Sequence, residues 1–165
     1  MTRTIHGALA GMSGAATMNV LRMLAHRAGL IDVMVPQKVE QRVRRAVGVR
    51  RWPTPGAYRI VDQLLHLGYG ATWGALFGAI TPRAANISPP LTIAFGLGLW
   101  GLGSFVLFPA LGIGRPAWAS SPRENAVNIA AHLAYATATT LLVEELARQP
   151  MRDVETRRAR AGRVG

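Results

Sequence analysis

The sequence of 165 residues contains no cysteine and few acidic residues. The absence of cysteine excludes disulfides, thiol nucleophiles and metal sites that are held by thiolates. Eight acidic residues stand against 19 basic ones, which gives a formal net charge of +11 at pH 7. The GxSxG, HExxH, GxGxxG and P-loop motifs are also missing. We therefore expect a protein that is not an enzyme and that needs no cofactor.

Charged side chains are also absent from four long apolar segments. No Asp, Glu, Lys or Arg occurs in residues 4–21, 63–82, 84–114 and 126–143. A helix needs about 20 mostly apolar residues to cross a bilayer. A soluble bundle of four buried helices is disfavoured, because soluble helices normally have a polar face and residues 91–111 have none. The sequence therefore predicts an all-α, polytopic membrane protein with four transmembrane helices, over about residues 5–24, 60–80, 91–111 and 126–146.

A pattern in this sequence repeats at an offset of 66 residues, first from Trp52 to Gly70 and then from Trp118 to Ala136. Several positions are identical in both copies: Trp52/Trp118, Val61/Val127, His66/His132, Leu67/Leu133 and Tyr69/Tyr135. Self-similarity at a fixed offset indicates a duplicated structural unit. We predict that the unit is a helical hairpin and that two such hairpins form a four-helix bundle, related by a pseudo-twofold axis along the membrane normal.

Glycine is frequent in the predicted spans, where its spacing indicates helix packing. Small residues at four-residue intervals let helix backbones approach closely in a membrane. The residues that we expect at such contacts are Gly7, Gly11, Gly70, Gly74, Gly78, Gly98 and Gly101. The contacts could lie within the chain or between chains, so a second copy or another membrane protein is an expected partner.

The basic residues gather outside the predicted spans. Residues 25–59 form a basic connection, in which a short amphipathic helix from Pro36 would lie on anionic lipid headgroups. A solvated basic loop is the alternative. Residues 1–146 are expected to form one domain, and the basic tail over 147–165 is expected to be disordered. Because the charge flanks apolar spans, it suits lipid better than nucleic acid. It divides too evenly between the two sides to predict the orientation.

Two matching polar stripes lie within the second and fourth predicted spans. Their residues fall at i, i+4 and i+7, which places each set on one helix face: Asp62, His66 and Tyr69, and then Asn128, His132 and Tyr135. Polar side chains in a bilayer usually face the bundle interior. Three interpretations stay open: hydrogen bonds that fix helix packing, a polar or proton path that uses the imidazoles, and axial ligation of a b-type haem by His66 and His132.

The C-terminal half carries a further pattern. It combines a span rich in glycine and alanine, the segment 108–113 (FPALGI), Trp118, Glu124 with Asn125, and His132 eight residues after Glu124. With these features, residues 96–148 resemble the YagU-like family of bacterial inner-membrane proteins, whose biochemical function is unknown. The resemblance implies a multi-pass inner-membrane protein, linked to envelope or acid stress. It carries over no catalytic residue, and the chain lacks the family's long segment between the first two spans.

These observations together favour one function and leave two alternatives. We expect a non-enzymatic protein of the bacterial inner (plasma) membrane, structural or accessory in role, that acts through helix contacts. The first alternative is a small transporter or proton-conducting protein that uses the paired His and Tyr stripes. The second is a b-type haem-binding electron carrier.

Overall fold

The computed structural model describes residues 3–31, 44–45, 48, 55–81, 86–112 and 115–161. For residues 55–59, 62 and 149–161 it describes the backbone alone. This part of the chain is all-helical, as predicted, and contains no strand. The helices are α1 (Arg3–Arg27), α3 (Pro55–Ile80), α4 (Pro89–Gly101), the π-helical η1 (Leu102–Leu107), α5 (Phe108–Leu111), the short 3-10 turn η2 (Ala117–Ala119) and α6 (Pro122–Ala161). The amphipathic helix predicted from Pro36 falls mostly outside the described residues.

Each of the four predicted spans corresponds to a long helix. Two of these helices, Pro89–Leu111 and Pro122–Arg148, are long and apolar enough to cross a membrane. Helices α1 and α3 have 25 and 26 residues, which is sufficient length for a bilayer. Their membrane-spanning role stays a prediction, as does the duplicated hairpin.

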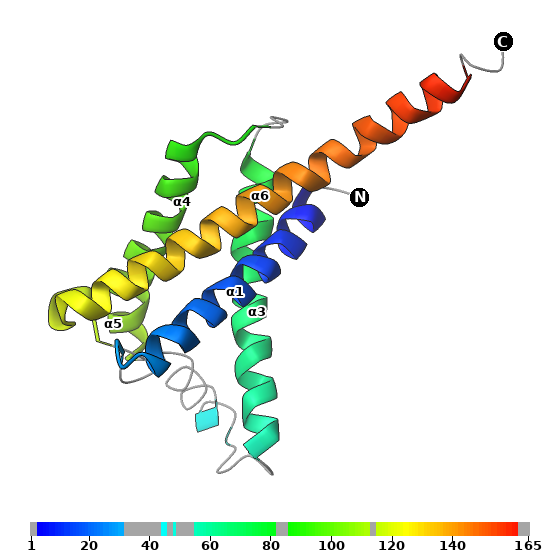
Figure 1. The fold of residues 1–165 in the computed structure, drawn as a ribbon. Helices are drawn as coiled ribbons and strands as arrows, with labels where there is room; N and C mark the ends of the chain where they lie inside the picture. The colour runs from blue at the N-terminus through cyan, green and yellow to red at the C-terminus, as the bar shows by residue number, and fades with distance from the viewer. Residues whose placement is uncertain are drawn as a thin grey trace.

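Helix α1 lies between α3 and α6 in this fold, and α4 lies against α6 (Figure 1). The rings of Phe77 in α3 and Phe95 in α4 stack with centroids 4.3 Å apart, so α3 and α4 are also in contact. The buried cluster at the centre draws residues from α1, α4 and α6: Ala15, Met18, Leu99, Ala131, Tyr135 and Ala136. Half of this cluster is alanine, which lets the helices approach closely.

The contact between α1 and α3 is formed by glycine on glycine. A Cβ atom placed on Gly74 would lie 2.3 Å from the carbonyl oxygen of Gly7 and 2.6 Å from the Cα of Gly11. A Cβ on Gly70 would lie 2.7 Å from the carbonyl oxygen of Gly11, and one on Gly78 would lie 3.0 Å from the Cα of Gly7. Real Cβ atoms do not approach other atoms this closely, so the two backbones touch only because these positions have no side chain.

The packing role predicted for Gly98 and Gly101 is not found within the described chain. A Cβ on either residue would meet no atom within 4 Å among the described residues. Helix α4 instead faces α6 with Gly96, where a Cβ would lie 3.0 Å from the carbonyl oxygen of His132. Positions 96 and 98 point about 200° apart around a helix of 3.6 residues per turn, so both cannot serve the same contact.

The third span is interrupted by the π-helical turn η1. The backbone N–H of Phe108 donates to the carbonyl oxygen of Gly103, five residues earlier. Pro109 follows immediately and has no N–H to donate to the carbonyl of Phe105. The wider turn lets the helix pass this proline, and Gly112 then ends it with a left-handed φ of 61°.

The fourth helix is longer than its predicted span. Helix α6 continues to Ala161, so most of the segment that we expected to be disordered is helical (Figure 1). Eight of the fifteen residues from 147 to 161 are Ala or Arg, which have high helix propensity. Local propensity thus extends the helix past the apolar segment.

Replacing Gly74 with Ala should destabilise the fold, because the new methyl group would overlap the backbone of α1. Overpacking of this kind costs about 1–3 kcal/mol. Gly98→Ala is the matched control, since it adds the same methyl group where nothing lies nearby. Thermal unfolding of the detergent-purified protein measures both. An unfolding midpoint for Gly74→Ala equal to that of Gly98→Ala would contradict the packing described here.

Candidate functional site

The two histidines of the polar stripes are both partly buried, one on α3 and the other on α6. His66 on α3 lies against the backbone of Ala15 in α1, and it is close enough to His132 on α6 for the two imidazoles to interact electrostatically. The Nε2 atom of His66 is buried and has no hydrogen-bond partner. The site therefore lies where α1, α3 and α6 come together.

His132 is oriented by its own helix. Its Nδ1 donates to the carbonyl oxygen of Asn128 at 2.7 Å, because a carbonyl can only accept. This bond fixes the ring's tautomer when it is neutral and leaves Nε2 for another partner. Asn128 thus contributes through its main chain. The equivalent residue of the other stripe is Asp62, whose side chain lies outside the described residues.

The two tyrosines at equivalent positions have different environments. Tyr135 is 4% exposed, and its hydroxyl donates to the carbonyl oxygen of Gly70 at 2.7 Å. Tyr69 is 44% exposed and packs edge-on against Trp73, with ring centroids 6.0 Å apart. The difference arises because α6 is covered by both α1 and α4, whereas α3 packs mainly on α1. The stripes therefore do not contribute equally to the interior.

Arg22 completes the site, although no motif in the sequence points to it. It is 5% exposed, and it interacts electrostatically with both His66 and His132. Its Nε atom is buried without a hydrogen-bond partner. The signal in the sequence is its spacing, because Arg22 continues the buried face of α1 that runs through Gly7, Ala10, Gly11, Gly14, Ala15, Met18 and Ala25.

Close helix packing argues against haem at the two histidines. One turn after His66, a Cβ on Gly70 would lie 2.6 Å from the Cβ of Ala15 and 3.4 Å from the ring of Tyr135. Beside His132, Gly96 of α4 is in contact with the α6 backbone. Among the described residues these contacts leave little space for a macrocycle between the imidazoles. The arrangement instead provides a small polar site with a positive charge.

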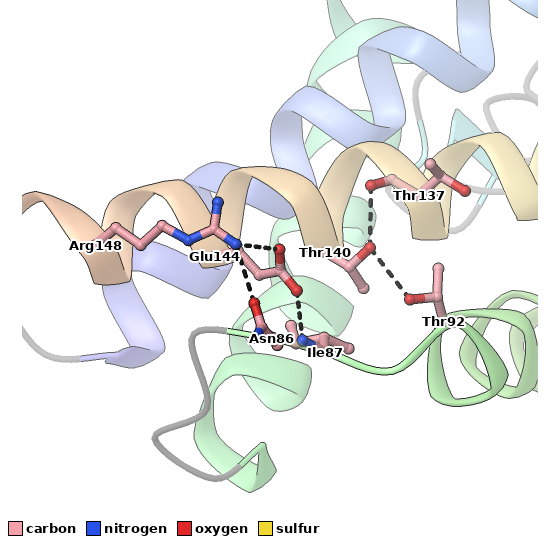
Figure 2. A network of polar contacts seen from close by, with 7 residues as sticks. All are labelled: Asn86, Ile87, Thr92, Thr137, Thr140, Glu144 and Arg148. Atoms are coloured by element: carbon pink, nitrogen blue, oxygen red, sulfur yellow. Dashed lines mark hydrogen bonds and ion pairs between the residues drawn. The ribbon is translucent and has the colours of Figure 1, made fainter.

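A second polar network joins α6 to the segment before α4 (Figure 2). Glu144 accepts a hydrogen bond from the backbone N–H of Ile87 and forms an ion pair of 3.1 Å with Arg148, as its i, i+4 spacing predicts. Arg148 also donates to the side-chain oxygen of Asn86 at 3.3 Å. One turn earlier on α6, Thr140 lies 3.4 Å from the hydroxyl of Thr92. This network fixes the start of α4 on α6 and offers no reactive pair.

The family-matching residues at the start of α6 have a structural role in the described chain. Glu124 accepts from the backbone N–H of Ser121 at 2.8 Å, and the Ser121 hydroxyl accepts from the N–H of Glu124 at 3.2 Å. This reciprocal pair is a capping box. The side-chain amide of Asn125 donates to the carbonyl oxygen of Ala117 at 2.9 Å and so holds the preceding turn.

Comparisons with known proteins identify no relative. No protein-family model, no curated protein and no solved structure matches this chain.

Tyr135→Phe should lower stability by about 1 kcal/mol, the usual cost of one lost buried hydrogen bond. Tyr69→Phe is the matched control, because it makes the same change at the equivalent, half-exposed position of the other stripe. Thermal unfolding in detergent compares the two variants. Equal effects would show that the bond from Tyr135 to Gly70 contributes nothing to stability.

Proposed function

We propose that this protein is a non-enzymatic component of the bacterial inner membrane, with four transmembrane helices, that acts in a structural or accessory role. One observation carries the proposal: the long helices bury glycine and alanine and present large apolar side chains outward. Such side chains are exposed on α1, α3, α4, η1 and α6, among them Ile5, Val20, Leu64, Leu76, Ile80, Ile93, Phe105, Val106 and Leu141. Soluble proteins rarely expose so much apolar surface. In a bilayer these apolar side chains would face the apolar acyl chains of the lipid.

The contacts at equivalent repeat positions support the duplicated hairpin. Gly70 of α3 packs on the preceding span, α1, and the equivalent Ala136 of α6 packs on its own preceding span at Gly96 of α4. The unequal tyrosines are the main departure from this symmetry. Membership of the YagU-like family remains a proposal, which rests on the pattern of residues from 96 to 148, including Glu124 and Asn125 at the start of α6.

A small transporter or proton-conducting protein is the second candidate. The observation that favours it is the group of Arg22, His66 and His132, since ionisable residues inside a membrane bundle commonly mark substrate or proton pathways. The scaffold interpretation treats the same three residues as packing elements. The two candidates therefore differ in what a change at His66 should do.

The four-span topology is tested with single cysteines, because the natural sequence has none. Four spans require that cysteines at positions 28 and 115 react with a membrane-impermeant maleimide from one side of the membrane. Cysteines at positions 88 and 160 should then react only from the other side. If α4 and α6 alone crossed the membrane, position 28 would react together with position 88. That result would contradict the four-span proposal.

Proton conduction is tested in liposomes that contain a pH-sensitive dye and the purified protein. A scaffold should give no proton flux above that of empty liposomes, for the wild type and for His66→Gln alike. His26→Gln is the control, because His26 is an exposed histidine at the end of α1. A flux that is present in the wild type and in His26→Gln, but lost in His66→Gln, would replace the scaffold with the second candidate.

A further inference from the structure

The buried arginine of α1 has no counter-charge in the described part of the chain. Arg22 is 5% exposed, and an arginine side chain stays cationic in proteins. The ionisable groups that act on the site from α3 and α6 are His66 and His132, which are either neutral or cationic. No described carboxylate forms an ion pair with Arg22. A buried charge without a partner is strongly unfavourable.

Two nitrogen atoms of this group lack a hydrogen-bond partner: Nε of Arg22 and Nε2 of His66 are both buried without one. His132 donates from Nδ1 to Asn128, so its Nε2 carries a proton only when the ring is cationic. The three side chains come from three helices and act on one another electrostatically. The complement of such a group is a ligand that carries negative charge and several acceptor oxygens.

We propose that Arg22, His66 and His132 form a binding site for a phosphate-type oxyanion between α1, α3 and α6. The guanidinium group supplies fixed charge and paired N–H donors that match two oxygens of the anion. His66 contributes a further donor when its Nε2 carries a proton, and His132 does so only in its cationic form, because its Nδ1 proton is already donated to Asn128. This site goes beyond the scaffold role, because it gives the bundle interior a ligand.

The depth of the site favours phosphate over other oxyanions. Arg22 lies five residues before Arg27, the last residue of α1, which corresponds to about 7–8 Å along a helix. In a helix that spans the bilayer, this places the guanidinium near the boundary between acyl chains and headgroups. Phosphate is the oxyanion that every phospholipid carries at that level. The source could be the headgroup of an anionic lipid or free inorganic phosphate.

Asp62 is the rival counter-charge, since it lies one turn before His66 in α3. If Asp62 neutralised Arg22, no uncompensated positive charge would remain for added phosphate to bind. The response of the wild-type protein to phosphate therefore decides between an internal and an external anion.

The experiment measures the thermal unfolding midpoint of the full-length protein in an uncharged detergent. Inorganic phosphate and dihexanoyl phosphatidylglycerol are titrated separately, and sodium chloride of equal ionic strength controls for screening. We expect at least one of the two phosphate ligands to raise the unfolding midpoint of the wild-type protein. Arg22→Gln should weaken binding, so that the half-saturating ligand concentration rises at least about tenfold, as expected for the loss of a charged hydrogen-bond pair. Arg123→Gln removes the same charge from an exposed site of α6 and should respond as the wild type does.

Each outcome decides the proposal. A response to inorganic phosphate shows that the free anion suffices, and a response to phosphatidylglycerol alone identifies a lipid headgroup as the ligand; both support the site. If Arg22→Gln does not fold, Arg22→Lys replaces it, because lysine keeps the charge but loses the paired donors and should bind measurably more weakly. The proposal is wrong if the wild type responds to neither ligand, or if the Arg22 variant responds with unchanged affinity.

Discussion

The close contact between the backbones of α1 and α3 is the constraint on which the rest of this structure depends. Gly7 and Gly11 meet Gly70, Gly74 and Gly78 with no side chain between them. In lipid the hydrophobic effect does not drive helices together, so close packing and hydrogen bonds must do so. Because α1 lies this near to α3, the side chain of Tyr135 on α6 can reach the backbone of α3 past Gly14 of α1. Its hydroxyl bond to Gly70 then ties three helices together.

The same face of α1 that permits this contact also creates the interior polar site. After Ala15 the buried face continues through Met18 and Arg22 to Ala25. Since α3 and α6 both pack against α1, the side chain of Arg22 is buried and acts electrostatically on both histidines. The packing that stabilises one end of the bundle thus buries a charge toward the other end. One molecule can therefore combine the proposed scaffold role with the proposed ligand site.

The second half of the molecule is held differently. Helices α4 and α6 meet through Gly96 and Ala136, and polar bonds at two ends fix their positions. Glu144 holds the backbone before α4, and Asn125 holds the turn before α6. The pair α1 and α3 and the pair α4 and α6 therefore both meet through small residues but differ in what else secures them.

Much of the architecture follows from the sequence alone. Charge-free apolar segments predict the four long helices, and the four-residue spacing of glycine predicts the faces that carry Gly7, Gly11, Gly70, Gly74 and Gly78, because helical periodicity is a local property. The sequence could not decide which face of α4 meets α6: Gly96 makes this contact, and Gly98 and Gly101 lie away from it. It could not distinguish Tyr69 from Tyr135, which are identical in pattern and differ only in how many helices cover them. Arg22 was missed for the same reason: the charge of a residue near the end of a span becomes a buried charge only when two further helices close over it.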